Sequence, residues 1–105
     1  MKKISRYAAA LLFLLFSLGS FSQSNTLSGT VTNSDSKEFV SAVSVIIKGT
    51  TEGTFTDSRG NFKLTTGRSL PLTLVFSSIG FETRELEITG TDAVEVELTP
   101  SSVLG

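Results

Sequence analysis

The side chains that could do chemistry in this sequence are serines, threonines and carboxylates that lack the partners which would activate them. The chain contains no histidine and no cysteine. A serine nucleophile needs an adjacent base, usually histidine, and structural zinc sites are built mainly from cysteine and histidine. The sequence therefore predicts no catalytic residue, no cofactor-binding residue, no cofactor and no metal ligand, and it indicates that the chain is not an enzyme.

Two glycine-containing segments have a superficial likeness to ligand-binding loops. Residues 57–61 (Asp-Ser-Arg-Gly-Asn) lack the alternating oxygen ligands and the closing glutamate of a calcium loop. A tight hairpin explains them better, because Asp57 can cap its own turn and Gly60 can adopt a left-handed conformation. Gly49–Gly53 has neither the lysine nor the following helix of a phosphate-binding loop. This segment predicts a second hairpin.

The first 22 residues have the three parts of a secretory signal peptide. Lys2, Lys3 and Arg6 precede an almost wholly apolar run from Ala8 to Leu18, and small residues stand at 20 and 22. A membrane anchor needs about 20 apolar residues, and this run is nearer half that length. We expect cleavage after Ser22, with an uncleaved anchor or a buried core helix as the alternatives.

The charges of residues 23–105 argue against nucleic acid as a partner. This part holds six basic and ten acidic residues, a net charge of about −4 (six against ten), and the basic residues form no patch. Most of the acids lie late in the sequence, at Glu82, Glu85, Glu87, Asp92, Glu95 and Glu97. The pattern favours solvated strand faces over an acidic binding surface.

Alternation with a period of two runs through the rest of the chain and predicts half-buried β-strands. One face is apolar in each run, as in Val94, Val96 and Leu98 beside Glu95 and Glu97. The inward residues of the other runs are expected to be Leu27, Gly29, Val31, Val43, Val45, Ile47, Phe62, Leu64, Leu72, Leu74 and Phe76. Turn formers separate the runs at nearly regular spacing, which favours a sandwich over alternating strands and helices.

One stretch breaks this alternation. Phe81 has the opposite parity from Leu86 and Ile88, so a single regular strand could not bury all three. We expect a bend or bulge at residues 79–81, with Gly80 as the pivot, and a strand that begins near Thr83.

Several segments together resemble the carboxypeptidase-regulatory-like domain. They are S-G-T-V-T-N at Ser28–Asn33, the run Ala42–Leu64, V-F-S-S-I-G-F-E-T at Val75–Thr83 and V-E-V-E-L-T at Val94–Thr99. The resemblance implies an all-β fold, a seven-stranded antiparallel prealbumin/Ig-like β-sandwich, preceded here by the signal peptide. The family usually has a proline and a glycine just before the second strand, where this chain has Val40-Ser41-Ala42. The implied organisation is a signal peptide at 1–22, the domain at 23–99 and the start of a linker at 100–105.

Domains of this family occur most often as N-terminal extensions of TonB-dependent outer-membrane transporters in Bacteroidota. The resemblance therefore implies a non-catalytic accessory domain that docks or couples on the periplasmic side of the outer membrane. Its expected partners are the plug and barrel of such a transporter or the energy-transducing complex, and no small-molecule substrate of this segment can be identified. The alternative is a free-standing binding or adhesion module, periplasmic or secreted.

Without catalytic groups, the activity is expected to be binding through loops or unpaired strand edges. The uncharged runs Val43–Ile47 and Leu72–Phe76 are strongly β-prone and would be aggregation hazards at an edge, so we expect them to be central. The first and last strands, Leu27–Thr32 and Ala93–Thr99, are then the expected edges.

Overall fold

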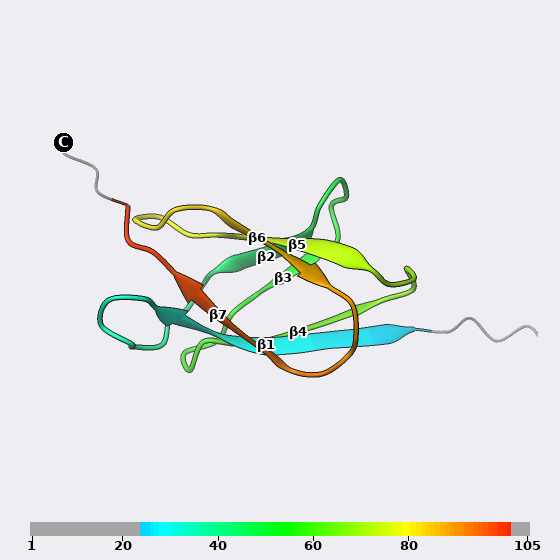
Figure 1. Cartoon of the computed structure of the whole chain (residues 1–105), viewed down its shortest axis with the longest axis horizontal. Coiled ribbons are helices and arrows are strands. Elements are labelled where there is room, and N and C mark those ends of the chain that lie inside the picture. The colour runs from blue at the N-terminus through cyan, green and yellow to red at the C-terminus, as the bar shows by residue number, and fades with distance from the viewer. Residues whose placement is uncertain (1–23, 102–105) are drawn as a thin grey trace, which may run out of the picture.

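The computed structural model describes residues 24–101, and these residues form seven strands (Figure 1). The strands are β1 (Asn25–Asn33), β2 (Ser44–Ile47), β3 (Gly53–Phe55), β4 (Asn61–Thr66), β5 (Leu72–Ser77), β6 (Arg84–Ile88) and β7 (Val94–Leu98). The signal peptide predicted at 1–22 and most of the linker predicted at 100–105 lie outside the described residues. Within 24–101 there is no helix long and apolar enough to cross a membrane.

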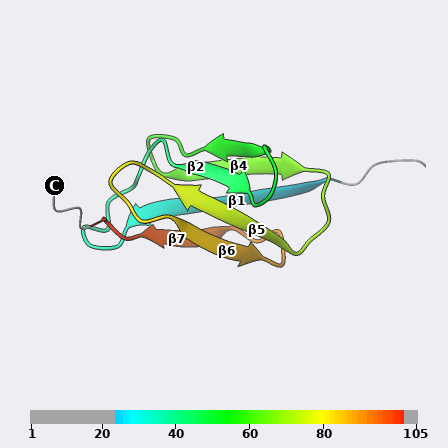
Figure 2. The same ribbon diagram turned by 90° about the horizontal axis from the view of Figure 1, so that it is seen from above.

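The strands form two layers, a three-stranded sheet in the order β4-β1-β7 and a four-stranded sheet in the order β3-β2-β5-β6. Figures 1 and 2 show the two layers from the side and from above, with the described chain entering at one end and leaving at the other. The predicted all-β, seven-stranded sandwich is confirmed.

One pairing corrects the expectation of a wholly antiparallel arrangement. β1 and β7 run parallel, in register from Gly29↔Val94 to Asn33↔Leu98, whereas the other four strand pairs are antiparallel. A parallel pair needs a long connection between its strands. The whole of the second sheet lies between β1 and β7 in the sequence and supplies that connection.

The core lies between the sheets and contains the apolar face of every strand except β3, as the alternation predicts for these strands. Side chains such as Val45, Leu74 and Val96 are wholly buried. The rings of Phe62 on β4 and Phe76 on β5 meet edge to face across the core, with centroids 5.5 Å apart. Gly29 leaves room for this packing, because a Cβ there would lie 2.8 Å from the Phe62 ring.

The predicted bend before β6 is confirmed. Gly80 has a φ of 88°, and the amide of Phe81 donates to the carbonyl of Ser78 at 3.1 Å, which closes a turn. β6 begins at Arg84, after the turn, so the alternation of inward and outward side chains that places Leu86 and Ile88 inward does not have to include Phe81. Phe81 is only partly buried, packs against the core from outside the strand and pairs in an isolated bridge with Pro100.

Both segments that have a likeness to ligand-binding loops are turns, but only Gly49–Gly53 is the turn of a hairpin. In residues 57–61, the Asp57 carboxylate accepts hydrogen bonds from the amides of Arg59 and Asn61, both at 2.9 Å, and Gly60 has a φ of 72°. The hairpin expectation is wrong here, because the turn carries the chain from β3 in one sheet to β4 in the other. Gly49–Gly53 does join an antiparallel pair, β2 and β3.

The connection into β2 contains a strained backbone position. Ala42 has a φ of 58°, in the left-handed region that costs a residue with a Cβ about 1–2 kcal/mol. This residue belongs to the segment in which the family usually has a glycine, and glycine would adopt the same φ without that cost. The core positions that follow, Val43 and Val45, are fully buried nevertheless.

Candidate docking surfaces

The strand edges are the first candidate surfaces, and their positions differ in part from the expectation. β2 and β5 are central in their sheet, as predicted, and β7 is an edge, as predicted. The prediction that β1 is an edge is wrong, because β4 pairs with one side of it and β7 with the other. The four edges are β4 and β7 in one sheet and β3 and β6 in the other.

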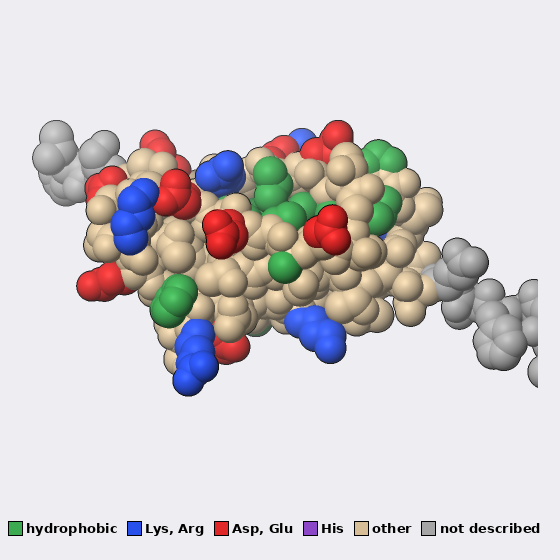
Figure 3. Space-filling model, turned by 60° about the horizontal axis from the view of Figure 1, so that its bottom comes forward, with side chains coloured by type: hydrophobic (Ala, Val, Ile, Leu, Met, Phe, Trp, Pro, Cys, Tyr) green, Lys and Arg blue, Asp and Glu red, His purple; other side chains and the backbone are tan. Residues whose placement is uncertain are grey.

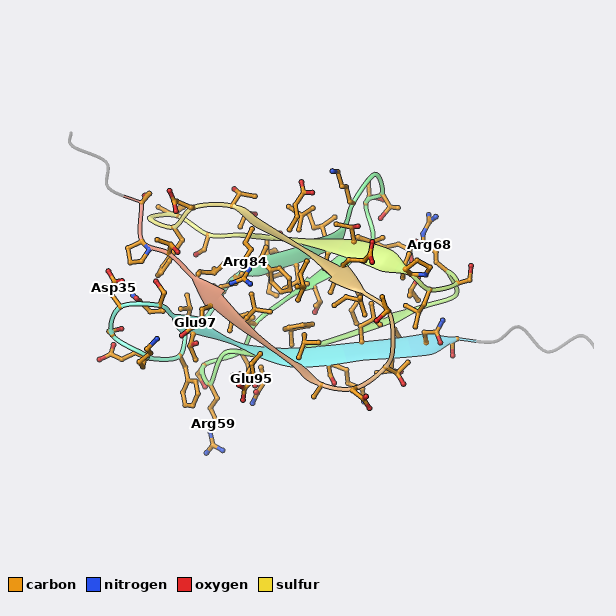
Figure 4. The ribbon with its side chains drawn as sticks, viewed as in Figure 1. Asp35, Arg59, Arg68, Arg84, Glu95 and Glu97 are labelled. Carbon is orange, nitrogen blue, oxygen red and sulfur yellow. The ribbon has the colours of Figure 1, made fainter. Side chains whose placement is uncertain are left out.

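The C-terminal end of the described chain is tied across the gap between the sheets. The Glu82 amide donates to the Thr99 carbonyl at 2.8 Å, and the Ser101 amide donates to the Gly80 carbonyl at 2.9 Å. The Arg84 guanidinium donates to the Glu97 carbonyl at 2.7 Å, and Figure 4 shows Arg84 extending from β6 to β7. The orientation of the outgoing chain is therefore fixed by contacts with both sheets.

A single apolar side chain projects beside this exit. Ile79 is fully exposed, at 101%, on the turn whose Gly80 carbonyl accepts the hydrogen bond from Ser101. Ile79 contributes nothing to the core, so the stability of the domain does not explain why an isoleucine stands at this position.

The predicted solvated faces are confirmed for the late acids, which are all exposed. Two of them form ion pairs, Glu97 with Lys37 at 2.7 Å and Glu85 with Lys48 at 2.9 Å. The hydrogen bond from Lys37 lowers the pKa of Glu97. Figure 3 shows acidic and basic side chains scattered over one side of the molecule without a large patch of one sign.

Glu52 forms a cluster with Thr66 and Arg68 that joins the start of β3 to the end of β4. Its carboxylate accepts hydrogen bonds from the Arg68 guanidinium and from the Thr66 hydroxyl, the latter at 3.0 Å. The Arg68 hydrogen bond, followed by that of Thr66, lowers the pKa of Glu52. The cluster closes one end of the β3 edge, and no motif in the sequence indicated it.

Two hollows lie on the outer faces of the sheets. One, of about 430 Å³, is lined by Thr30 and Thr32 of β1, Glu95 and Glu97 of β7 and the exposed Phe39. The other, of about 220 Å³, is lined by Ser44, Ile46, Thr51, Gly53, Thr54 and Phe55. In residues 24–101 no group of three or more histidine, cysteine, aspartate or glutamate side chains could hold a metal ion.

Comparison with protein families decides the relationship that the sequence segments suggested. The family described as CarboxypepD_reg-like domain matches residues 27–104. The chain belongs to this family. The carboxypeptidase-regulatory-like domain of this chain thus includes all seven strands, from within β1 to the exit after β7.

The curated relatives of this carboxypeptidase-regulatory-like chain are receptors. It is 30% identical to the TonB-dependent receptor P3 of Formosa agariphila, over 92% of this chain and 10% of the receptor. It is 35% identical to the TonB-dependent receptor SusC of Bacteroides thetaiotaomicron, over 71% of this chain and 7% of the receptor. The chain spans a tenth or less of the length of these relatives.

A solved structure that is similar to this one comes from a protein complex. The carboxypeptidase-regulatory-like chain is similar to a chain in a type II Cohesin-X-Dockerin complex from Acetivibrio cellulolyticus, a C-terminal interface mutant. The TM-score is 0.56 and the identity 26%, over 71% of this chain and 52% of that chain.

Proposed function

We propose that this chain is a non-catalytic N-terminal accessory domain of a TonB-dependent outer-membrane nutrient transporter. Membership of the carboxypeptidase-regulatory-like family and the identity to several TonB-dependent receptors support the assignment. The domain docks or couples on the periplasmic side, and its partners are the plug and barrel or the energy-transducing complex. A signal peptide at 1–22 exports it, and N-terminal sequencing of the exported protein should then begin at or near Gln23.

The observation that carries the proposal is the fixed exit of the chain. Backbone hydrogen bonds from Glu82 to Thr99 and from Ser101 to Gly80 join the outgoing segment to the turn before β6. A domain on a flexible tether would leave its neighbour free to reorient, whereas this exit transmits the orientation of the sandwich to whatever follows. Ile79 stands beside the exit and provides an apolar contact for the next segment.

Deleting residues 23–99 from the full-length parent, with the signal kept, tests this function. We expect nutrient-dependent growth to fall while the barrel still assembles in the outer membrane. Unchanged uptake would reduce the domain to a passive spacer, and loss of the barrel would make it an assembly factor.

A smaller change tests the fixed exit itself. A short Gly-Ser insertion after Ser101 leaves every strand intact but uncouples the orientation of the domain from the next segment. The same insertion at Gly90, in an exposed turn with open space around it, is the matched control. We expect reduced uptake only for the insertion after Ser101, and equal uptake in both variants would argue against orientational coupling.

The alternative is a free-standing binding module, and the likeness to a chain of the Cohesin-X-Dockerin complex favours it. The reading frame beyond Gly105 discriminates between the two. A continuing frame that encodes a plug and barrel supports the transporter, and a stop codon supports the free module.

A further inference from the structure

The hollow on the outer face of the sheet β4-β1-β7 has a polar floor between two different walls. Thr30 and Thr32 of β1 line it and are in register with Glu95 and Glu97 of β7. On the other side of Thr32 lies Phe39, which pairs with it in an isolated bridge. Neighbouring strands are about 4.8 Å apart, so the backbones of Phe39 and Glu97 are roughly 10 Å apart. The hollow is therefore a slot with an aromatic ring on one side and carboxylates on the other.

The stability of the domain explains neither wall of this slot. Phe39 is 60% exposed and is not part of the core. Within residues 24–101, Glu95 forms no ion pair, and Glu97 uses its Oε2 for Lys37, which leaves Oε1. Figure 4 shows both glutamates on β7. Of the described residues that line the hollow, none is basic, so its negative charge is available to a ligand.

A cation is the group that satisfies both walls. A positive charge centred over Thr32 would lie about 5 Å from each wall, within the roughly 6 Å over which an aromatic ring attracts a cation. A guanidinium fits better than an ammonium, because its plane stacks on a ring and its five N–H groups can reach carboxylate and hydroxyl oxygens. An anion would meet like charges, and an apolar group would desolvate the carboxylates without a partner. The slot therefore selects arginine.

The spacing of the two carboxylates indicates how the arginine is carried. Exposed ion pairs and cation–π contacts are weak, so a free arginine would bind only at roughly tens of millimolar. Glu95 and Glu97 lie two residues apart on one face of β7, about 6.6 Å along the strand. Alternate residues of an extended segment have the same spacing, so two arginines on one segment reach both carboxylates and add their contacts.

A second copy of the chain cannot supply such a segment. None of the nine basic residues in the sequence stands two positions from another. The occupant is therefore a different protein, and the net charge of about −4 of residues 23–105 (six basic against ten acidic) favours the approach of a basic one.

We propose that this hollow docks an extended segment of a partner protein that carries arginines at alternate positions. One guanidinium lies between Phe39 and Glu97, and the other pairs with Glu95. The inference goes beyond the accessory role proposed above and does not depend on it. Because binding is measured on this chain itself, a negative result leaves the transporter assignment unchanged.

The probe is a capped peptide of sequence Ser-Arg-Ser-Arg-Ser, titrated into the exported, ¹⁵N-labelled chain at about 20 mM salt, where exposed charges are least screened. NMR follows the backbone amides. We expect saturable shifts at Thr30, Thr32, Glu95 and Glu97, with a Kd of about 1 mM. The same peptide with citrulline in place of arginine keeps the shape without the charge and should give no saturable shift. Free arginine should not approach saturation at the same concentrations.

Four substitutions of exposed residues locate the binding. Glu95→Gln should weaken it at least about threefold by removing an ion pair, and Phe39→Leu about threefold by removing the ring. Lys37→Ala should tighten it about twofold, because Glu97 Oε2 is released for the peptide. Glu87→Gln is the matched control, an exposed glutamate on β6 without an ion pair, and should leave binding unchanged.

Four results would overturn the proposal. The first is the absence of saturable shifts up to about 5 mM peptide, a concentration that detects weak binding. The second is equal binding of the citrulline peptide. The third is an equal loss in Glu95→Gln and Glu87→Gln, which would mean that net charge alone attracts the peptide. The fourth is free arginine that binds as tightly as the peptide, which would make the ligand a small molecule.

Discussion

The hydroxyl of Thr56 donates a 2.8 Å hydrogen bond to the carbonyl of Val40. The same oxygen accepts a hydrogen bond of 2.9 Å from the amide of Val43, so one buried side chain holds both ends of the segment Val40–Val43 that leads into β2. This connection includes the strained Ala42, whose own amide donates to the Thr56 carbonyl at 3.0 Å. Thr56 therefore stabilises the segment in which the backbone is least favourable.

Replacing Thr56 by valine should lower the free energy of unfolding by about 1–3 kcal/mol. The shape of the side chain is kept, but the buried amide of Val43 and carbonyl of Val40 each lose a partner. Chemical denaturation measures the loss. Thr65→Val is the control, because the Thr65 hydroxyl is exposed and bonds only to the Thr26 hydroxyl at 3.3 Å. An equally small effect in both variants would show that the Thr56 hydrogen bonds are dispensable.

Val45→Asp should unfold the domain. Val45 is 0% exposed, so the variant would bury a charge without a partner at a cost of several kcal/mol. That cost is a large part of the roughly 5–15 kcal/mol that stabilises a typical domain. Far-ultraviolet circular dichroism and thermal melting measure the outcome, with the exposed Glu95→Ala as a nearly neutral control. A melting temperature like that of the wild type would contradict the strand register.

Ala42→Gly should stabilise the domain by about 0.5 kcal/mol. Glycine relieves about 1–2 kcal/mol of strain at a φ of 58°, but it also makes the unfolded chain more flexible, which offsets part of the gain. Ala93→Gly is the control at an exposed position without a positive φ, and it should be neutral or destabilising. If both variants lost stability equally, strain at Ala42 would not be the reason.

The domain should lose stability as the pH falls through the range in which the carboxylates of Glu52 and Glu97 become protonated. In the folded state, the hydrogen bond from Arg68 lowers the pKa of Glu52 below its ordinary value of 4.5. The hydrogen bond from Lys37 lowers the pKa of Glu97 in the same way. A carboxyl whose pKa is lower when folded contributes stability above its unfolded pKa and loses it as the pH falls through the folded pKa. Denaturation between pH 6 and about pH 2 should therefore show less acid sensitivity in Glu52→Gln than in the wild type. Glu87→Gln, at an exposed position without an ion pair, should not differ from the wild type in this respect.

The sequence predicts which face of each strand is buried, because parity is a local property. The alternation of Val94, Val96 and Leu98 with glutamates leaves one orientation that keeps the charges in water, and the reversal at Gly80 was visible in the same way. Which strands lie next to each other in a sheet, in contrast, depends on residues that are far apart in the sequence. Parity could not show that β7 pairs with β1, nor that the turn at Asp57 leads into the other sheet.

The outward position of Phe55 could not be predicted for a related reason. Phe55 is a residue type that usually lies in a core, and no pattern in a three-residue strand shows that its side chain is on the outer face. Thr56 was equally hidden, since a threonine beside a turn is usually solvated and its burial depends on the contact with Val40. Both positions are decided by how the two sheets stack.

The parallel pairing of β1 with β7 determines how the domain would respond to a pulling force. The described chain enters beside the start of β1 and leaves after the end of β7, so tension between the two ends slides these strands past each other. The ladder from Gly29↔Val94 to Asn33↔Leu98 would then be strained along its whole length at once, whereas tension across the open ends of β5 and β6 would break their contacts one after another. Single-molecule stretching through the two ends should accordingly require a higher force than stretching between Leu72 and Ile88, and the sandwich should behave as a stiff link along the direction of the chain.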